Sequence, residues 1–212
     1  MTTASHDQPV FPASGSKAQH EWTPEDPLEP PEQALLDHAL AGTRLDLVSD
    51  GPVDHGAMRD WGPAHTVRAA ALRHLLVAPQ WALHSKGVSL RGVRISGRLG
   101  LESATVRCPL LLEDCYLDSL DPLTLDYATV PRIVLSRCRV AGAVSANLLV
   151  VTKELHFSGS VFEAVVRLAG ADITGQLNCS GAKLTGTDGD GTWTSPREVD
   201  TGAMRPWSTV AG

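Results

Sequence analysis

The sequence is poor in aromatic residues, which make up 5% of its 212 residues, and it has no apolar run long enough to cross a membrane. A helix that spans a bilayer needs about 20 predominantly apolar residues. The sequence also lacks a basic start followed by an apolar stretch and a cleavage site, so we expect no signal peptide. These absences favour a cytoplasmic protein, at most peripheral to the membrane.

Motifs for metal or cofactor binding are missing as well. The eight histidines are scattered, without His-Glu-x-x-His or Cys-x-x-Cys spacing nearby. No Gly-x-Gly-x-x-Gly run stands between a strand and a helix, as a dinucleotide site requires. We therefore predict no cofactor and no catalytic, cofactor-binding or metal-binding residue, and we favour a protein without enzyme activity.

Three groups of residues have side chains that could form a catalytic or metal-binding site, but a structural or solvated role is favoured for each. Four aspartates near an insertion could act as catalytic carboxylates, although charged corners predict the same residues: Asp114, Asp118, Asp121 and Asp126. A second group lies in a stretch for which a solvated loop is favoured: Asp54, His55, Asp60 and His65. The segment from Thr187 to Thr192 is similar to a calcium loop but has Val199 in place of the bidentate glutamate, so we favour a polar turn.

What the sequence does contain is an internal repeat from Val93 to Leu184. One apolar slot recurs every eleven residues, apart from a two-residue insertion and a one-residue deletion: Ile95, Val106, Leu117, Val130, Val140, Val151, Phe162, Ile173 and Leu184. Three further slots recur in each unit, and Ser160 is the only polar residue in any of them. Apolar residues two apart, such as Leu110 and Leu112, share a face on a strand but not on a helix. Each unit is therefore two short strands, and two units form one four-sided coil.

The repeat resembles a known group of proteins. Pairs such as Ala104-Thr-Val106 and Ala171-Asp-Ile173 resemble those of pentapeptide-repeat proteins, although steps of five and six alternate here. The segments "VRLAGADITGQLNCSGAKL", "LLLEDCYL" and "VRAAALRHLL" are similar to actinobacterial pentapeptide-repeat-like proteins often labelled membrane-associated oxidoreductase-like. This resemblance covers roughly residues 60–190. It implies that the chain is an all-β solenoid, namely a right-handed quadrilateral β-helix of about four coils. It also implies that the chain is a truncated member of the group.

Two other repeat folds fit less well. Leucine-rich repeats return after about 20–29 residues rather than eleven. Left-handed hexapeptide helices need a period of six throughout.

The sequence predicts that the whole chain has four parts. Residues 1–30 are polar and proline-rich and predict a disordered tail, and residues 186–212 predict a flexible C-terminal tail. Residues 86–185 are predicted to form the β-helix. Residues 31–85 predict a short helical cap that covers the first coil, with one helix from Pro31 to Leu40 and another from Pro63 to about Val77. We expect Trp61 and Trp81 to pack in this cap.

The charge distribution limits which kinds of partner we expect, and the cysteines predict how the core is packed. The net charge is −6, but basic and acidic residues nearly balance within the solenoid. Imitation of DNA toward gyrase, known for some pentapeptide-repeat proteins, would need an acidic solenoid. Nucleic-acid binding would need free arginines, whereas a solvated face shared with nearby carboxylates is favoured for these residues: Arg91, Arg94, Arg98, Arg132, Arg137 and Arg139. Cys115 and Cys138 should stack as reduced thiols, and Cys108, at an outward corner, should react first with a thiol reagent.

The sequence as a whole favours a non-enzymatic scaffold or protein-interaction module. We expect an unknown protein partner, or self-association through the C-terminal coil unless Trp193, Met204 and Trp207 fold back onto it. We expect no nucleic-acid partner and no membrane span. The alternatives are an accessory or remnant of a membrane-associated oxidoreductase-like protein and a gyrase-interacting DNA mimic.

Overall fold

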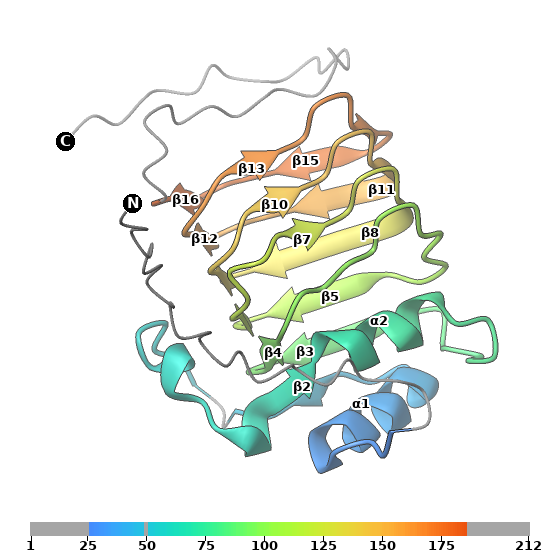
Figure 1. Cartoon of the computed structure of the whole chain (residues 1–212), viewed down its shortest axis with the longest axis vertical. Coiled ribbons are helices and arrows are strands. Elements are labelled where there is room, and N and C mark those ends of the chain that lie inside the picture. The colour runs from blue at the N-terminus through green and yellow to red at the C-terminus, as the bar shows by residue number, and fades with distance from the viewer. Residues whose placement is uncertain (1–25, 49–50, 186–212) are drawn as a thin grey trace, which may run out of the picture.

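The chain folds as a parallel β-solenoid of about four coils with two helices at its N-terminal end (Figure 1). The computed structural model describes residues 26–48 and 51–185. The all-β solenoid with a short helical cap is thereby confirmed. Within the described residues, no helix is long and apolar enough to cross a membrane. The tails expected at residues 1–30 and 186–212 lie almost wholly outside these ranges.

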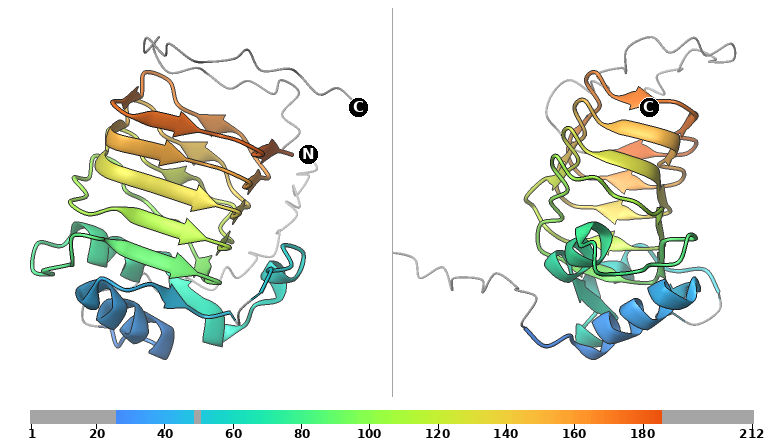
Figure 2. Two further views of the ribbon diagram at one scale, coloured as in Figure 1. Left: turned by 180° about the vertical axis from the view of Figure 1, so that it is seen from behind. Right: turned by 90° about the vertical axis from the view of Figure 1, so that its right-hand side faces the viewer.

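Three parallel sheets form the walls of the solenoid. Sheet A contains β1 (Leu45–Asp46), β3 (Val88–Arg91), β5 (Leu110–Glu113), β8 (Thr129–Ser136), β11 (Val150–His156), β14 (Asp172–Ile173) and β15 (Gln176–Asn178). Sheet B contains β2 (Thr66–Arg68), β4 (Arg94–Ser96), β6 (Tyr116–Leu117), β9 (Arg139–Val140), β12 (Val161–Phe162) and β16 (Lys183–Leu184). Sheet C contains β7 (Leu123–Thr124), β10 (Val144–Ser145) and β13 (Val166–Arg167). Sheets A and C lie on opposite sides (Figure 2).

A fourth wall closes the prism without a separate sheet. It consists of the first residues of β8 and β11, together with β14 and an isolated bridge between Thr105 and Thr129. The one-residue deletion removes part of a corner between this wall and sheet A. Strands β8 and β11 each run without a break from the fourth wall into sheet A. The deletion falls in β8, and it shifts the register of this pair between Val151 and Glu154.

The core is formed by stacked columns of inward side chains. Val88 pairs with Leu110, Leu110 with Ile133, Ile133 with Leu155, and Leu155 with Leu177, so like slots lie above one another. The repeat slots are buried from the first coil to the fourth, apart from three partly buried slots near the C-terminal end: Leu177, Ala182 and Leu184. The inward pattern read from the sequence is confirmed.

Each unit turns through one left-handed residue immediately before its small slot. Five of these residues are not glycine: Ser103, Asp114, Tyr127, Arg137 and Leu148. The equivalent positions in other units are glycines, among them Gly159 and Gly170. Left-handed backbone is unfavourable for residues with a Cβ, so the stacked ladder must hold these corners in place.

The first cap helix lies where the sequence predicts it. Helix α1 (Pro30–Ala41) begins with two prolines and ends at Gly42, whose φ of 67° closes the helix. Its buried residues Leu35 and Ala39 belong to the main core.

The second cap helix is shorter than predicted. Helix α2 spans only Ala69–Val77, because Pro63–His65 form a 3-10 turn (η2) and Thr66–Arg68 form strand β2. Val67 is fully buried and pairs with Ile95, so a rung of sheet B replaces the first turns of the expected helix. The β-branched residues Thr66 and Val67 suit this strand.

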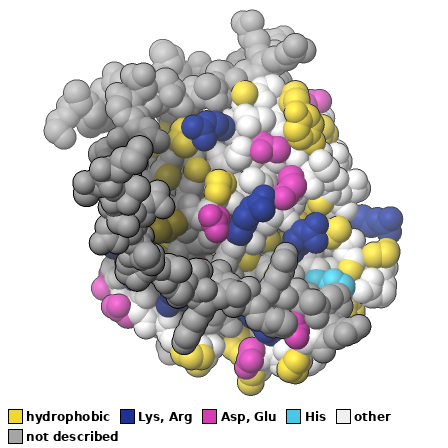
Figure 3. Space-filling model, in the orientation of Figure 1, with side chains coloured by type: hydrophobic (Ala, Val, Ile, Leu, Met, Phe, Trp, Pro, Cys, Tyr) yellow, Lys and Arg dark blue, Asp and Glu magenta, His cyan; other side chains and the backbone are white. Residues whose placement is uncertain are grey.

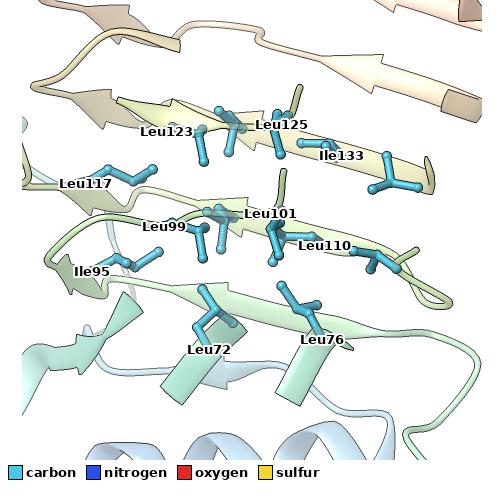
Figure 4. Close-up of a cluster of buried hydrophobic side chains, with 14 of the residues drawn as sticks. Leu72, Leu76, Ile95, Leu99, Leu101, Leu110, Leu117, Leu123, Leu125 and Ile133 are labelled. Carbon is cyan, nitrogen blue, oxygen red and sulfur yellow. The ribbon is translucent and has the colours of Figure 1, made fainter. Parts of the chain in front are cut away.

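Helix α2 takes the place that a strand would occupy beneath sheet C. Leu72 and Leu76 point from the helix toward Leu99 and Leu101 of the first coil (Figure 4). The side chain of Arg73 donates from Nε to the carbonyl oxygen of Gly100 at 2.7 Å. The helix therefore covers the apolar end of the solenoid and satisfies part of its open ladder.

A buried carboxylate joins the two cap helices. Glu32 of α1 is 1% exposed and accepts hydrogen bonds from the backbone nitrogen of Arg68 at 2.9 Å and from its Nε at 2.7 Å. Burial alone would raise the pKa of Glu32, but these bonds and a backbone bond to Glu29 lower it. Glu32 stays charged and fixes the start of α2 against α1.

The two-residue insertion widens one corner between sheets B and C. Its backbone folds over Gly142 of the next coil, and a Cβ there would lie 2.5 Å from the carbonyl oxygen of Asp121 and 2.6 Å from that of Ser119. We expect Gly142→Ala to destabilise the protein by about 2 kcal/mol, because backbone rather than a side chain must move. Urea unfolding followed by circular dichroism tests this. Gly62→Ala, at a position with nothing within 4 Å, is the control and should be neutral.

Candidate interaction surfaces

The most buried charged residue of the solenoid lies at the corner between sheets A and B. Asp114 is 2% exposed and accepts hydrogen bonds from Arg91 Nε at 3.0 Å, in the coil below, and from Arg137 Nε at 2.8 Å, in the coil above. Burial alone would raise the pKa of Asp114, but the bonds from Arg137 and Arg91 outweigh burial and lower it. This triad ties three coils together.

The other arginines considered for nucleic-acid binding are paired with carboxylates too. Arg94 Nε lies 2.7 Å from Asp118, and Arg98 Nη2 lies 2.7 Å from Glu102. Arg132 pairs with Glu154, and Arg139 pairs with Glu163. Acidic and basic side chains accordingly lie beside one another on the side that carries sheet C (Figure 3). The solenoid presents mixed charge, as its balanced composition predicts.

The four candidate catalytic aspartates are not brought together. Asp114 lies at the corner between sheets A and B, whereas Asp118 follows β6 and accepts from Arg94. Asp126 lies beyond sheet C, where it accepts from Ser145 Oγ and from the backbone nitrogen of Asn147 at 2.7 Å. Asp121 is exposed in the inserted corner. Each of the three paired carboxylates stabilises its own corner, so the four share no reaction site.

The histidine group does not form a metal site. Among the described residues, no three His, Cys, Asp or Glu side chains are arranged to hold an ion. His65 stacks on Trp61, with ring centroids 5.5 Å apart, and its Nδ1 lies 3.3 Å from the carbonyl oxygen of Gly92. The other predicted cap tryptophan, Trp81, packs against the main core. The segment from Thr187 to Thr192 lies outside the described residues.

A small pocket lies beneath the inserted corner. Its lining is mainly apolar, and Ser119 and Asp121 supply its only polar side chains. Ser119 Oγ already accepts a hydrogen bond from the backbone nitrogen of Asp121 at 3.1 Å. The pocket therefore offers little for recognising a polar ligand.

Cys108 was expected at an outward corner, and that placement was wrong, because this side chain is buried. Cys108 is 7% exposed and belongs to the main core, and burial raises the pKa of its thiol. The alternation of inward and outward residues continues through this corner, from Val106 across Cys108 to Leu110. Cys115 and Cys138 are fully buried, and each thiol lies within bonding distance of backbone carbonyl oxygens.

All four free cysteines should therefore resist modification in the folded protein. We expect a thiol reagent such as DTNB to label Cys108, Cys115, Cys138 and Cys179 slowly under native conditions and completely in denaturant, because all four thiols are buried and burial raises the pKa of the Cys108, Cys138 and Cys179 thiols. Mass spectrometry of partly labelled protein gives the order. Rapid native labelling of Cys108 would contradict its buried position.

The C-terminal end of the solenoid differs from the capped N-terminal end. No described strand pairs with the outer edges of β13, β14, β15 and β16. Leu177, Ala182 and Leu184 continue the buried columns but are themselves only partly buried. Open ladder edges beside apolar side chains favour pairing with another chain.

Sequence analysis missed a contact on the outside of sheet B. Met58, in the 3-10 helix η1 (Ala57–Asp60), is fully buried in a cluster with Tyr116 and Ala141. Val53 and Trp61 pack against the same cluster. The sequence predicted a solvated loop here, and a lone methionine in a polar stretch gave the only signal of burial.

Comparison with known proteins leaves the relationships of this chain open. No protein-family model matches it, and no curated protein or solved structure matches it either.

Proposed function

We propose that this protein is a non-enzymatic scaffold or protein-interaction module of the cytoplasm, and that it associates through the C-terminal end of its solenoid. The observation that carries the proposal is the open end of the last coil, where no described strand pairs with the outer edges of β13 to β16. A second copy or a partner strand placed there would pair the backbone groups and bury Leu177 and Leu184.

The remaining surface supports a structural rather than a catalytic role. The buried carboxylate Asp114 is neutralised by arginines of neighbouring coils, and the candidate aspartates lie at separate corners. Such inter-coil pairs hold a rigid frame, which suits a protein that positions others. The pentapeptide-repeat-like and oxidoreductase-like relationships remain proposals that rest on sequence resemblance.

Size-exclusion chromatography with light scattering tests the proposal. We expect the full chain to form a dimer or larger assembly, and Leu184→Lys to shift it to the monomer, because a charge would then lie on the end surface. Leu120→Lys makes the same change at a leucine that is 85% exposed on the side of the solenoid, and it should have no effect.

Three outcomes of this experiment oppose the proposal in different ways. A wild-type monomer at every concentration would exclude self-association. An assembly insensitive to Leu184→Lys would place the interface elsewhere. Visible absorbance from a bound cofactor in the same peak would contradict a non-enzymatic role. A chain ending at Thr185 shows whether the preceding results depend on residues 186–212.

A further inference from the structure

Residues 51–62, which we call the strap, lie along the outer face of sheet B and cross its rungs. Met58 contacts Tyr116 of β6 and Ala141, which follows β9. Arg59 Nη2 donates to both carboxylate oxygens of Glu163, which follows β12, at 2.8 and 2.9 Å. The strap therefore connects three successive coils from outside the solenoid.

The strap is attached to sheet B through side chains. Inside the strap, the backbone nitrogen of Ala57 donates to the carbonyl oxygen of Asp54 at 3.1 Å, and that of Trp61 donates to the carbonyl oxygen of Met58 at 3.4 Å. The carbonyl oxygen of Trp61 accepts from the side chain of Arg94 at 3.0 Å. No backbone hydrogen bond joins residues 51–62 to sheet B in the described parts of the chain.

This mode of attachment makes the strap easier to detach than a rung. Each rung is held by ladder hydrogen bonds on both sides and by inward side chains, and it opens only with its neighbours. The strap depends on one fully buried side chain, on hydrogen bonds from the Arg91 and Arg94 side chains to its carbonyl oxygens, and on one ion pair at the surface, which contributes little. Segments with few buried contacts are the first to open in a folded protein.

The surface beneath the strap has a defined chemistry, which the strap itself reveals. Tyr116 and Ala141 form an apolar contact with the long unbranched side chain of Met58, and the carboxylate of Glu163 binds the guanidinium group of the next residue, Arg59. We call Tyr116, Ala141 and Glu163 the strap surface. Methionine suits such a contact because its flexible thioether adapts to irregular apolar surfaces.

We propose that the strap surface is a docking site for a partner protein segment that carries a long apolar residue followed by a basic residue, and that the strap is its displaceable internal occupant. The inference deepens the proposed function by naming a second surface. It depends on the proposed function in one respect, namely that the molecule bound at the strap surface is a protein segment. While the strap is bound, it competes at the high effective concentration of a tethered ligand.

A peptide with the sequence of residues 51–62, in which photo-methionine replaces the methionine, tests the proposal. The full chain with Met58→Ser and Arg59→Ser has a weakened strap and should expose the strap surface. We expect irradiation to crosslink the peptide to the segment between β6 and β12 of this variant, with a yield about tenfold higher than for the wild type, where the tethered strap competes.

Two controls make the result specific. Adding Glu163→Gln to the variant should lower the crosslink yield, because it removes the acceptor for the basic residue. A peptide of the same composition in scrambled order should give no crosslinks to this segment. Running the variants on a Leu184→Lys background separates the result from association through the C-terminal end.

The alternative is that the strap is only a permanent clamp. Native crosslinking in equal yield to the wild type and the variant would overturn the proposal, because the tethered strap would then not compete. A folded variant that gives no crosslink between β6 and β12 would also overturn it. Far-ultraviolet circular dichroism of each variant, compared with the wild type, verifies that the solenoid is intact.

Discussion

Phe157→Ala should destabilise the protein by about 3–5 kcal/mol, because it removes a large side chain from a fully enclosed column. Phe157 is 0% exposed and packs edge to face against Phe162, with ring centroids 5.2 Å apart. Neighbouring rungs are held by the ladder and cannot collapse fully into the cavity. Urea unfolding followed by far-ultraviolet circular dichroism measures the loss.

An exposed aromatic residue of the same solenoid provides the control. Tyr127 is 64% exposed at a corner, and Tyr127→Ala should change the stability by no more than about 0.5 kcal/mol. Tyrosine and alanine both carry a Cβ, so the left-handed backbone at position 127 is equally strained before and after the substitution. Equal losses for the two variants would contradict the inward placement of Phe157.

Asp114→Asn should destabilise the protein by about 2 kcal/mol at neutral pH, since it removes the buried carboxylate between Arg91 and Arg137. Arg91 keeps Asp46 as a partner and Arg137 keeps Glu113, so the loss is smaller than for an unpaired buried charge. Asparagine keeps the size of the side chain and tolerates the left-handed conformation that Asp114 adopts, with a φ of 48°. The change therefore isolates the charge. Thermal and urea unfolding of both proteins measure the difference.

The effect of Asp114→Asn should depend on pH in one direction. The pKa of Asp114 is lowered in the folded protein, so the stabilisation by its charge is fully present above the unfolded pKa of about 3.9. That stabilisation is lost as the pH falls through the lower folded pKa. We expect a constant difference between the two proteins from pH 7 to about pH 5 and a smaller one below pH 4. A difference that grows toward acid would contradict a lowered pKa.

The corners show where local and tertiary factors meet. The sequence places glycine at some left-handed corners, such as Gly159 and Gly170, and these positions are predictable from the residue itself. Tyr127, Arg137 and Leu148 adopt the same conformation although their intrinsic preference opposes it. Only the stacking of coils above and below imposes it on them.

The sequence by itself determined the solenoid and its inward columns. Apolar residues at fixed spacing specify which side chains share a face, and this information is local, so it survives a two-residue insertion and a one-residue deletion. The same kind of local signal, two prolines and Gly42, determined the limits of α1. The association proposed for the C-terminal end rests on this pattern as well, because no described strand continues the columns beyond Leu184.

Only the tertiary structure decided which partners the remaining residues would find. Thr66 and Val67 could continue a helix, but pairing with β4 makes them a strand. Met58 reaches Tyr116 from a distant part of the sequence. These outcomes depend on contacts between segments far apart in the chain, and no spacing within one segment encodes them.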